Sequence, residues 1–329
     1  MISSTMPILY LIFSHDHQEQ VVRLVRTIRR LSPGAVITIH HDPSLFALDT
    51  SKFSNESAVH VVPNAVRGQW GDFSLVEQYL KALRWCLDNL NFDWVITLTG
   101  LSYPIKPLFE FENMLAKSNQ DAFVYHFDAF DPDHWPKGTA ATRYFYRYYR
   151  LPKFHYYYKI PTALRRVVES SRQWLNKHQS LVRVITMPRG ANTRFGMRRL
   201  RPPFGSHFRL QGGRQMINMH RRALHCVFDF LHNNPWWTEY ARRTLIPDES
   251  FFQTILANDP KLRVTNDVLR YIKWPTDRTH AASVAVIRSE EIPEVLRTSA
   301  PFALKLDSRI DTLALDLLDE YLEPYMRID

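Results

Sequence analysis

One acidic pair in the sequence stands where a catalytic carboxylate could work. Pro247-Asp248-Glu249-Ser250 precedes the apolar run FFQTIL, and a proline followed by acidic residues is typical of a helix start. Such a helix needs one carboxylate as its cap, and we assign that role to Asp248. Glu249 is then free to face a cleft and to accept a proton as a general base. The alternative is that Glu249 only stabilises the helix.

Two other groupings have the residue types of metal sites. His15-Asp16-His17 could be half of such a site, but no Cys or H-x-x-x-H partner occurs elsewhere, so a strand end with a helix cap is favoured. Asp131-Pro132-Asp133 has the D-x-D form of metal-dependent sugar-nucleotide enzymes. A D-P-D sequence after a strand is more often a turn, which we favour here.

Several common catalytic motifs do not occur. The sequence contains no G-x-G-x-x-G, no Walker loop and no G-x-S-x-G. The sequence therefore lacks the main motif of dinucleotide-binding proteins, of P-loop nucleotide-binding proteins and of α/β-hydrolases.

The first part of the chain predicts an α/β fold. Apolar runs indicate strands at 7–13, 35–41, 59–63, 93–99 and 121–127, with helices at 21–31, 73–90 and 107–117. This alternation predicts a mostly parallel sheet covered on both faces. Ligands bind beyond the carboxyl ends of such strands. We therefore expect a site at His15, Asp42, Trp70 to Ser74, and Gly100 to Lys106.

The later part repeats the pattern less regularly. Residues 128–206, called the basic lobe below, lack clear periodicity. Beyond them we expect strands at 208–219, 268–273 and 283–287, and helices near 220–232, 248–258, 289–299 and 310–323. One sheet-centred domain with an inserted lobe is expected.

Positive charge is concentrated in one stretch. From Arg143 to Arg214 there are 17 Lys/Arg and a single acid, Glu169, so this stretch carries +16 in a chain of net charge +9. Seven tyrosines lie among these cations. The combination predicts an anionic partner, and an anionic membrane is favoured over nucleic acid because no nucleic-acid-binding motif is present. A solvated basic surface without a ligand is the alternative.

Composition excludes several classes of protein. Of the 329 residues, 45% are hydrophobic and 23% charged, which is typical of globular proteins. No run of 18 apolar residues could span a membrane, and the N-terminal sequence predicts a buried strand instead of a signal peptide. The two cysteines, Cys86 and Cys226, indicate a reducing compartment. We expect a cytoplasmic protein, with peripheral contact at the inner face of the membrane.

The order of several segments resembles the core-2/I-branching β-glycosyltransferases. This family includes mucin-type β-1,6-N-acetylglucosaminyltransferases and peptide O-xylosyltransferases. The similar segments cover nearly the whole chain and are weakest in the basic lobe. They are LIFSHDHQEQVVRLV, ITIHHD, WGDFSLVEQYLKAL, WVITLTGLSYPIK, GGRQMINMHRRAL, PDESFFQTIL, RYIKW and PFALKLD.

This resemblance implies a GT-A-type fold and an inverting transfer from a UDP-sugar, GlcNAc or xylose, to a glycan or lipid-linked acceptor. Residues 1–127 would form the nucleotide-binding half and residues 207–329 the acceptor and catalytic half. Glu249 matches the family's base, and no divalent metal or other cofactor is implied. The matched UDP-sugar-binding residues are His15, Asp42, Trp70, Gly71, Ser74 and Lys305, with Arg278 as a substitute for a missing arginine; Trp274 and Lys273 match the acceptor site.

Two departures bear on donor choice and activity. The family's aspartate in G-x-D-[FY]-P is Ser102, and an arginine that contacts the diphosphate aligns with Ala282. A non-catalytic protein that binds glycans or anionic lipid surfaces on the same fold is therefore the alternative function.

Overall fold

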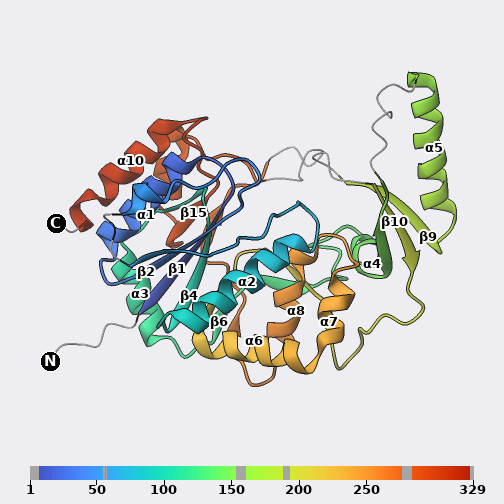
Figure 1. Ribbon diagram of the computed structural model, residues 1–329, viewed down its shortest axis with the longest axis horizontal. Coiled ribbons are helices and arrows are strands. Elements are labelled where there is room, and N and C mark those ends of the chain that lie inside the picture. The colour runs from blue at the N-terminus through green and yellow to red at the C-terminus, as the bar shows by residue number, and fades with distance from the viewer. Residues whose placement is uncertain are drawn as a thin grey trace.

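The computed structural model describes residues 7–54, 56, 58–152, 161–187, 193–275 and 284–326. It confirms the α/β class: a seven-stranded, mostly parallel sheet is covered by helices on both faces (Figure 1). The sheet order is β13-β6-β12-β4-β1-β2-β3, in which only β12 runs antiparallel to its neighbours. The strands are β1 Ile8–Ser14, β2 Val36–His41, β3 Val59–Val61, β4 Trp94–Thr99, β6 Ala122–Phe123, β12 Asn218–His220 and β13 Val264–Thr265.

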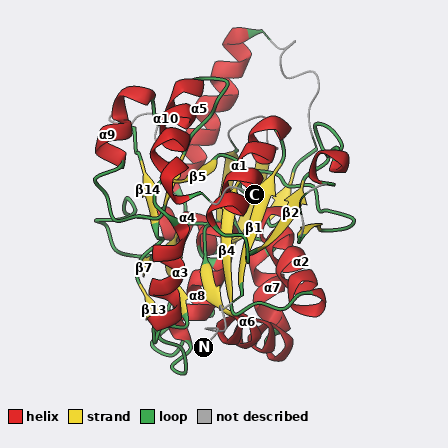
Figure 2. Ribbon diagram, turned by 90° about the vertical axis from the view of Figure 1, so that its left-hand side faces the viewer, coloured by secondary structure: helices red, strands yellow, loops and turns green. Residues whose placement is uncertain are grey.

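Strand β1 shows why the sheet is buried on both sides. Its seven residues are almost all apolar, and successive side chains point to opposite faces. Tyr10 and Ile12 join one hydrophobic core, whereas Leu9 and Leu11 join the other. The parallel partners β2 and β4 lie beside β1 in the middle of the sheet (Figure 2).

The two cores divide the helices into two layers. The first layer packs on the Tyr10 side and consists of α1 Gln18–Leu31, α3 Leu108–Lys117, α9 Ile292–Val295 and α10 Thr312–Leu322. The second packs on the Leu9 side and consists of α2 Ser74–Asn89, α6 Arg221–Asn233, α7 Pro235–Ala241 and α8 Phe251–Asn258. None of the helices in the described ranges is long and apolar enough to cross a membrane.

Two small sheets extend the edge where the strands end. One has the order β14-β15-β5 and the other pairs β11 with β7. Their strands are β5 Ser102–Pro104, β7 His126–Asp128, β11 Gln211–Gly213, β14 Arg270–Ile272 and β15 Phe302–Leu304. Short 3-10 turns complete the chain: η1 Thr50–Phe53, η3 Pro247–Glu249, η5 Ser289–Glu291 and η6 Glu323–Tyr325.

The basic lobe has regular structure that the sequence pattern did not predict. An antiparallel sheet of order β8-β10-β9 lies beside two helices. The elements are α4 Thr139–Tyr144, β8 Tyr146–Arg150, α5 Thr162–His178, β9 Val182–Thr186 and β10 Thr193–Arg198. Asp72, in the loop before α2, fastens this sheet to the main body, because Arg150 of β8 and Arg194 of β10 both bind its Oδ2, at 2.8 and 2.6 Å.

Three local predictions are wrong in detail. The stretch 208–219 holds the short strand β11 and only the first two residues of β12, and residues 284–287 are not in a strand. The helix expected at 248–258 begins at Phe251, after the separate turn η3. The predicted division into a nucleotide-binding and an acceptor half stays a prediction.

Candidate active site

The three central parallel strands end side by side at one edge of the sheet. The amide of Asp42, after β2, donates to the carbonyl of Ser14 at 2.7 Å. The amide of Gly100, after β4, donates to the carbonyl of Phe13 at 2.9 Å. The structure therefore brings together the strand ends at which the sequence predicted a site.

Asp42 holds the loop that crosses this edge. Its Oδ1 accepts from the amide and hydroxyl of Ser44, and its Oδ2 accepts from the Gly68 amide at 2.6 Å and from Gln78 at 3.3 Å. Burial alone would raise the pKa of Asp42, but these hydrogen bonds outweigh burial and lower it. A carboxylate has about four acceptor positions, and four donors occupy them here. A role for Asp42 in nucleotide binding stays a prediction.

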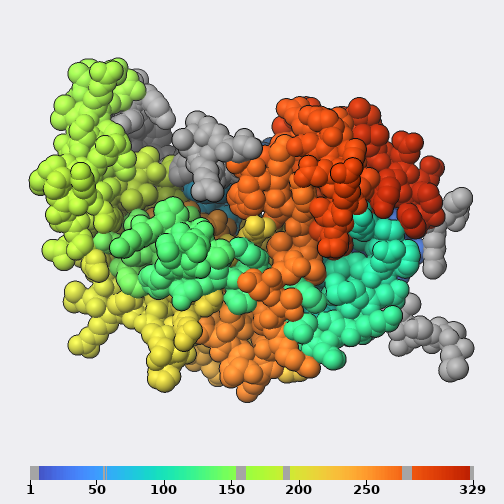
Figure 3. Space-filling view, turned by 180° about the vertical axis from the view of Figure 1, so that it is seen from behind, coloured from blue at the N-terminus to red at the C-terminus, as the bar shows by residue number. Residues whose placement is uncertain are grey.

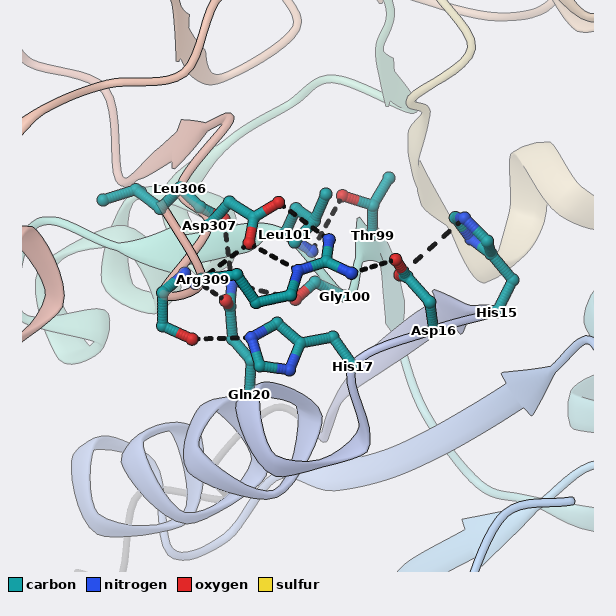
Figure 4. A network of polar contacts seen from close by, with 11 residues as sticks. His15, Asp16, His17, Gln20, Thr99, Gly100, Leu101, Leu306, Asp307 and Arg309 are labelled. Carbon is teal, nitrogen blue, oxygen red and sulfur yellow. Dashed lines mark hydrogen bonds and ion pairs between the residues drawn. The ribbon is translucent and has the colours of Figure 1, made fainter. Parts of the chain in front are cut away.

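His15 lies on the rim of the same edge. Its side chain is 65% exposed, and its Nε2 is 3.7 Å from the Asp16 carboxylate. Arg309 bridges Asp16 and Asp307, with 2.8 Å to each, and so connects the end of β1 to the turn after β15 (Figure 4). The His15-Asp16-His17 segment is thus held by an arginine.

The loop from Trp70 to Ser74 connects the strand edge with the turn that carries Glu249. The Ser74 hydroxyl accepts from the Gln69 amide at 2.9 Å, which fixes the loop at the start of α2. Gly71 has φ +71°, a left-handed backbone conformation that favours glycine. Its carbonyl accepts from the Ile246 amide at 3.0 Å, three residues before Glu249.

Glu249 lies at the end of η3 and is paired with Arg143 of the basic lobe. The guanidinium donates to Oε2 at 2.6 Å and also lies 4.6 Å from the centre of the Trp135 ring. Among the described residues, Oε1 has no hydrogen-bond partner, and the Glu249 side chain is 33% exposed. One carboxylate oxygen is therefore held while the other is open to a ligand.

Asp248 does not act as the predicted helix cap. Neither η3 nor α8 has a side-chain capping bond, and the buried Oδ1 of Asp248 has no partner among the described residues. Burial first, and then the charge of Glu249, raise the pKa of Asp248 to about 7. The two neighbouring acids thus have different surroundings: Glu249 is ion-paired and accessible, whereas Asp248 is poorly solvated.

The residues predicted to bind the acceptor lie in two different settings. Trp274 is 49% exposed, and the Arg214 guanidinium lies 5.2 Å from its ring centre. Lys273 points to Glu291 of η5 and forms an ion pair with it. Trp274 is therefore available to stack on a ligand, whereas Lys273 would first have to leave Glu291.

Lys305 follows β15 and is half-buried. Its ammonium forms no ion pair within the described part of the chain. The next residue, Leu306, donates its amide to the Leu101 carbonyl at 3.0 Å, so Lys305 lies near the loop after β4. Arg278 and Ala282 lie outside the described residues.

The structure explains two further sequence features. Ser102 is fully buried, and its hydroxyl accepts from the Thr99 amide at 3.1 Å, so it serves the turn after β4. Asp131 accepts from the Asp133 amide at 2.9 Å and contacts His134, which is the favoured turn. No group of three His, Cys, Asp or Glu side chains in the described ranges is arranged to hold a metal ion.

A cationic groove of about 540 Å³ adjoins the Arg143–Glu249 pair. Its charged lining residues are Lys137, Arg143, Arg183 and Arg198, and none of the carboxylates that the structure describes lines it. Trp70 and Tyr146 supply aromatic surface. Seen from behind, the yellow-green part of the lobe lies at the opposite end of the molecule from the red C-terminal segments (Figure 3). The groove suits an anionic or sugar-bearing ligand.

Sequence reasoning missed Arg143 and Arg214. Arg143 is one of 17 cations in its stretch, and no sequence feature distinguishes it from the others. Arg214 follows the glycine pair of β11, and its guanidinium lies 4.6 Å from the Tyr125 ring centre as well as near Trp274. A search for arginines next to the matched segments could have found Arg214.

One of the comparisons with known proteins identifies the family of this chain. The sequence model of the family described as "Branch: Core-2/I-Branching enzyme" matches residues 10–296. The curated proteins gave no significant match. A similar solved structure is a protein from Bacillus anthracis described as a glucose-1-phosphate thymidylyltransferase, in complex with a sucrose, at 11% identity and a TM-score of 0.26. The likeness covers 38% of this chain and 57% of that one.

The occupied carboxylate of Asp42 gives a stability prediction. Asp42→Asn should lower the free energy of unfolding by about 1–3 kcal/mol, because an amide nitrogen cannot accept from Gly68 or Gln78. Urea denaturation at pH 7 measures this. Asp49→Asn is the matched control, since the Asp49 carboxylate makes the same two bonds to Ser51 at an exposed site and accepts from no second loop among the described residues. Equal losses in the two variants would contradict the loop-holding role.

The raised pKa of Asp248 predicts that the free energy of unfolding depends on pH. Its pKa is about 7 in the folded protein and about 4 when unfolded, so the folded state binds more protons between these values. The free energy of unfolding therefore falls as pH rises from about 4 to 7. Asp248→Asn removes this loss, and its gain in stability should be larger at pH 8 than at pH 4.5, by a few kcal/mol at most. A gain that is the same at both pH values in urea denaturation would refute this.

Proposed function

The chain belongs to the Core-2/I-branching enzyme family and is a glycosyltransferase, and from that premise we propose an inverting, UDP-sugar-dependent reaction. The donor sugar is GlcNAc or xylose, and the acceptor is a hydroxyl of a glycan or lipid-linked sugar in surface glycan synthesis. Inversion takes one displacement, in which the acceptor oxygen attacks the anomeric carbon as UDP leaves. A base must take the acceptor proton in that step.

The placement of Glu249 is the observation that carries this proposal. Oε2 is fixed by Arg143 and Oε1 is accessible, so the carboxylate is both oriented and able to accept a proton. The backbone bond from Ile246 to Gly71 keeps the turn beside the loop of Trp70. The neighbouring cationic groove is suited to neutralise the charge that develops on the diphosphate.

Glu249→Gln tests the base. We expect kcat for transfer to fall by roughly 10²–10⁴-fold while UDP binding, measured by thermal shift, stays unchanged. Glu77→Gln is the matched control, because Glu77 also pairs with one arginine, Arg242, and its side chain is 34% exposed. Both variants lose an ion pair, but only the first should lose turnover.

Two outcomes argue against the proposal in different ways. Near-normal kcat in the Glu249→Gln variant would remove Glu249 as the base. UDP binding by the parent protein without transfer or donor hydrolysis would favour the non-catalytic binding function.

Lys305 is proposed to neutralise the diphosphate without a divalent metal. Lys305→Ala should lower kcat by about 10²–10³-fold with little effect on stability, because its ammonium has no ion pair to lose among the described residues. Lys305→Arg should recover part of the rate. Transfer should persist in excess chelator; complete loss that manganese restores would contradict the metal-free mechanism.

A further inference from the structure

Helix α5 is the most exposed helix of the basic lobe. It runs from Thr162 to His178, none of its residues is buried, and it projects from the body of the molecule (Figure 1). It contacts the lobe through polar groups: Arg172 and Asn176 both donate to the Val184 carbonyl of β9, at 3.1 and 2.8 Å. Asn176 also accepts from the Val184 amide. The polar side of the helix therefore faces the protein.

The apolar side of α5 faces outward. Leu164, Val167, Val168 and Trp174 are 52, 59, 47 and 61% exposed. Their spacing of three, four and ten residues places them on one side of a helix. Leu181, just beyond the helix, is 68% exposed. An amphipathic helix normally buries its apolar side against the core, so this reversed orientation calls for an apolar partner.

The surrounding charge selects the kind of partner. Arg166 and Lys177 are exposed on α5 outside its apolar side, and the helix's only acid, Glu169, is paired with Arg172. Cations around an apolar side with a tryptophan are typical of helices that lie in a membrane interface. A second copy of the lobe would bring two strongly positive surfaces together, which opposes self-association through this face.

We propose that α5 docks this protein on an anionic lipid bilayer. Leu164, Val167, Val168 and Trp174 enter the interface, while the neighbouring cations bind the lipid headgroups. Cations near an anionic leaflet strengthen binding in a way that salt screens, whereas the apolar side chains add a part that salt does not screen. This docking goes beyond the proposed transfer reaction and does not require it.

Vesicle co-sedimentation tests the proposal. The full chain is mixed with vesicles of phosphatidylglycerol and phosphatidylcholine, or of phosphatidylcholine alone, at low and at physiological salt. We expect binding to the anionic vesicles that weakens with salt, and at least about tenfold weaker binding to neutral ones.

Matched variants separate the apolar part from the charge. Val167→Ser with Trp174→Ser should weaken binding at least about tenfold at physiological salt. The control is Leu45→Ser with Leu313→Ser, two residues of similar exposure, 68 and 55%, that lie outside the lobe, one in a loop and one in α10. All four side chains are exposed, so the thermal transition and UDP binding should remain as in the parent, and a failure of the transferase assignment would leave this result unchanged.

Three results would overturn the proposal. Equal binding to neutral and anionic vesicles, or binding to neither, removes the charge-selective docking. Equal binding by the two double variants removes α5 as the docking element. Concentration-dependent dimers in sedimentation velocity that only the α5 variant abolishes, without vesicle binding, would assign the apolar side to a second copy of the chain.

Discussion

The carboxylate of Asp72 is the contact on which the arrangement of the site depends. It joins β8 and β10 of the basic lobe to the loop that carries Trp70 and Gly71, and that loop in turn binds the turn before Glu249. Burial opposes its ionised form, but hydrogen bonds from Arg150 and Arg194 lower the pKa of Asp72. Arg194 and Asp72 are only 6 and 14% exposed, and removing one partner of such a pair typically costs about 3–5 kcal/mol.

Acids from outside the lobe neutralise some of its cations and leave others for a ligand. Asp72 pairs with Arg150 and Arg194, and Glu249 pairs with Arg143. The groove is lined by Lys137, Arg183 and Arg198, and none of the described carboxylates lies in its lining. The positively charged residues of the lobe therefore fall into two groups: one group forms ion pairs that stabilise the fold, and the other is available to bind anionic molecules.

The sequence predicted the central sheet well because its signal is local. Strands such as β1 are continuous apolar runs, and parallel strands must end at one edge, so His15, Asp42 and the Trp70 loop could be placed before the structure was known. The lobe was not predicted, since tyrosines and arginines lie on both faces of β8 and the charged Arg194 is buried in β10, so residue polarity does not mark the buried face. The prediction that Asp248 caps the helix was wrong because Asp248 lies in the separate turn η3, before α8 begins. Helix propensity alone does not reveal that turn. The partner of Glu249 is 106 residues away and belongs to the tertiary structure.

The contacts of helix α1 with the C-terminal segment decide when this protein can fold. Gln20 donates to the Leu306 carbonyl, Arg23 binds Asp316 and Asp319, and these partners are separated by 286 to 296 residues. The core on this face of β1 is completed by Leu315 and Leu318 of α10. A growing chain exposes these first apolar residues while almost all of the remaining sequence is still being synthesised. The apolar residues of β1 and α1 on this face therefore stay partly uncovered until α10 has been synthesised.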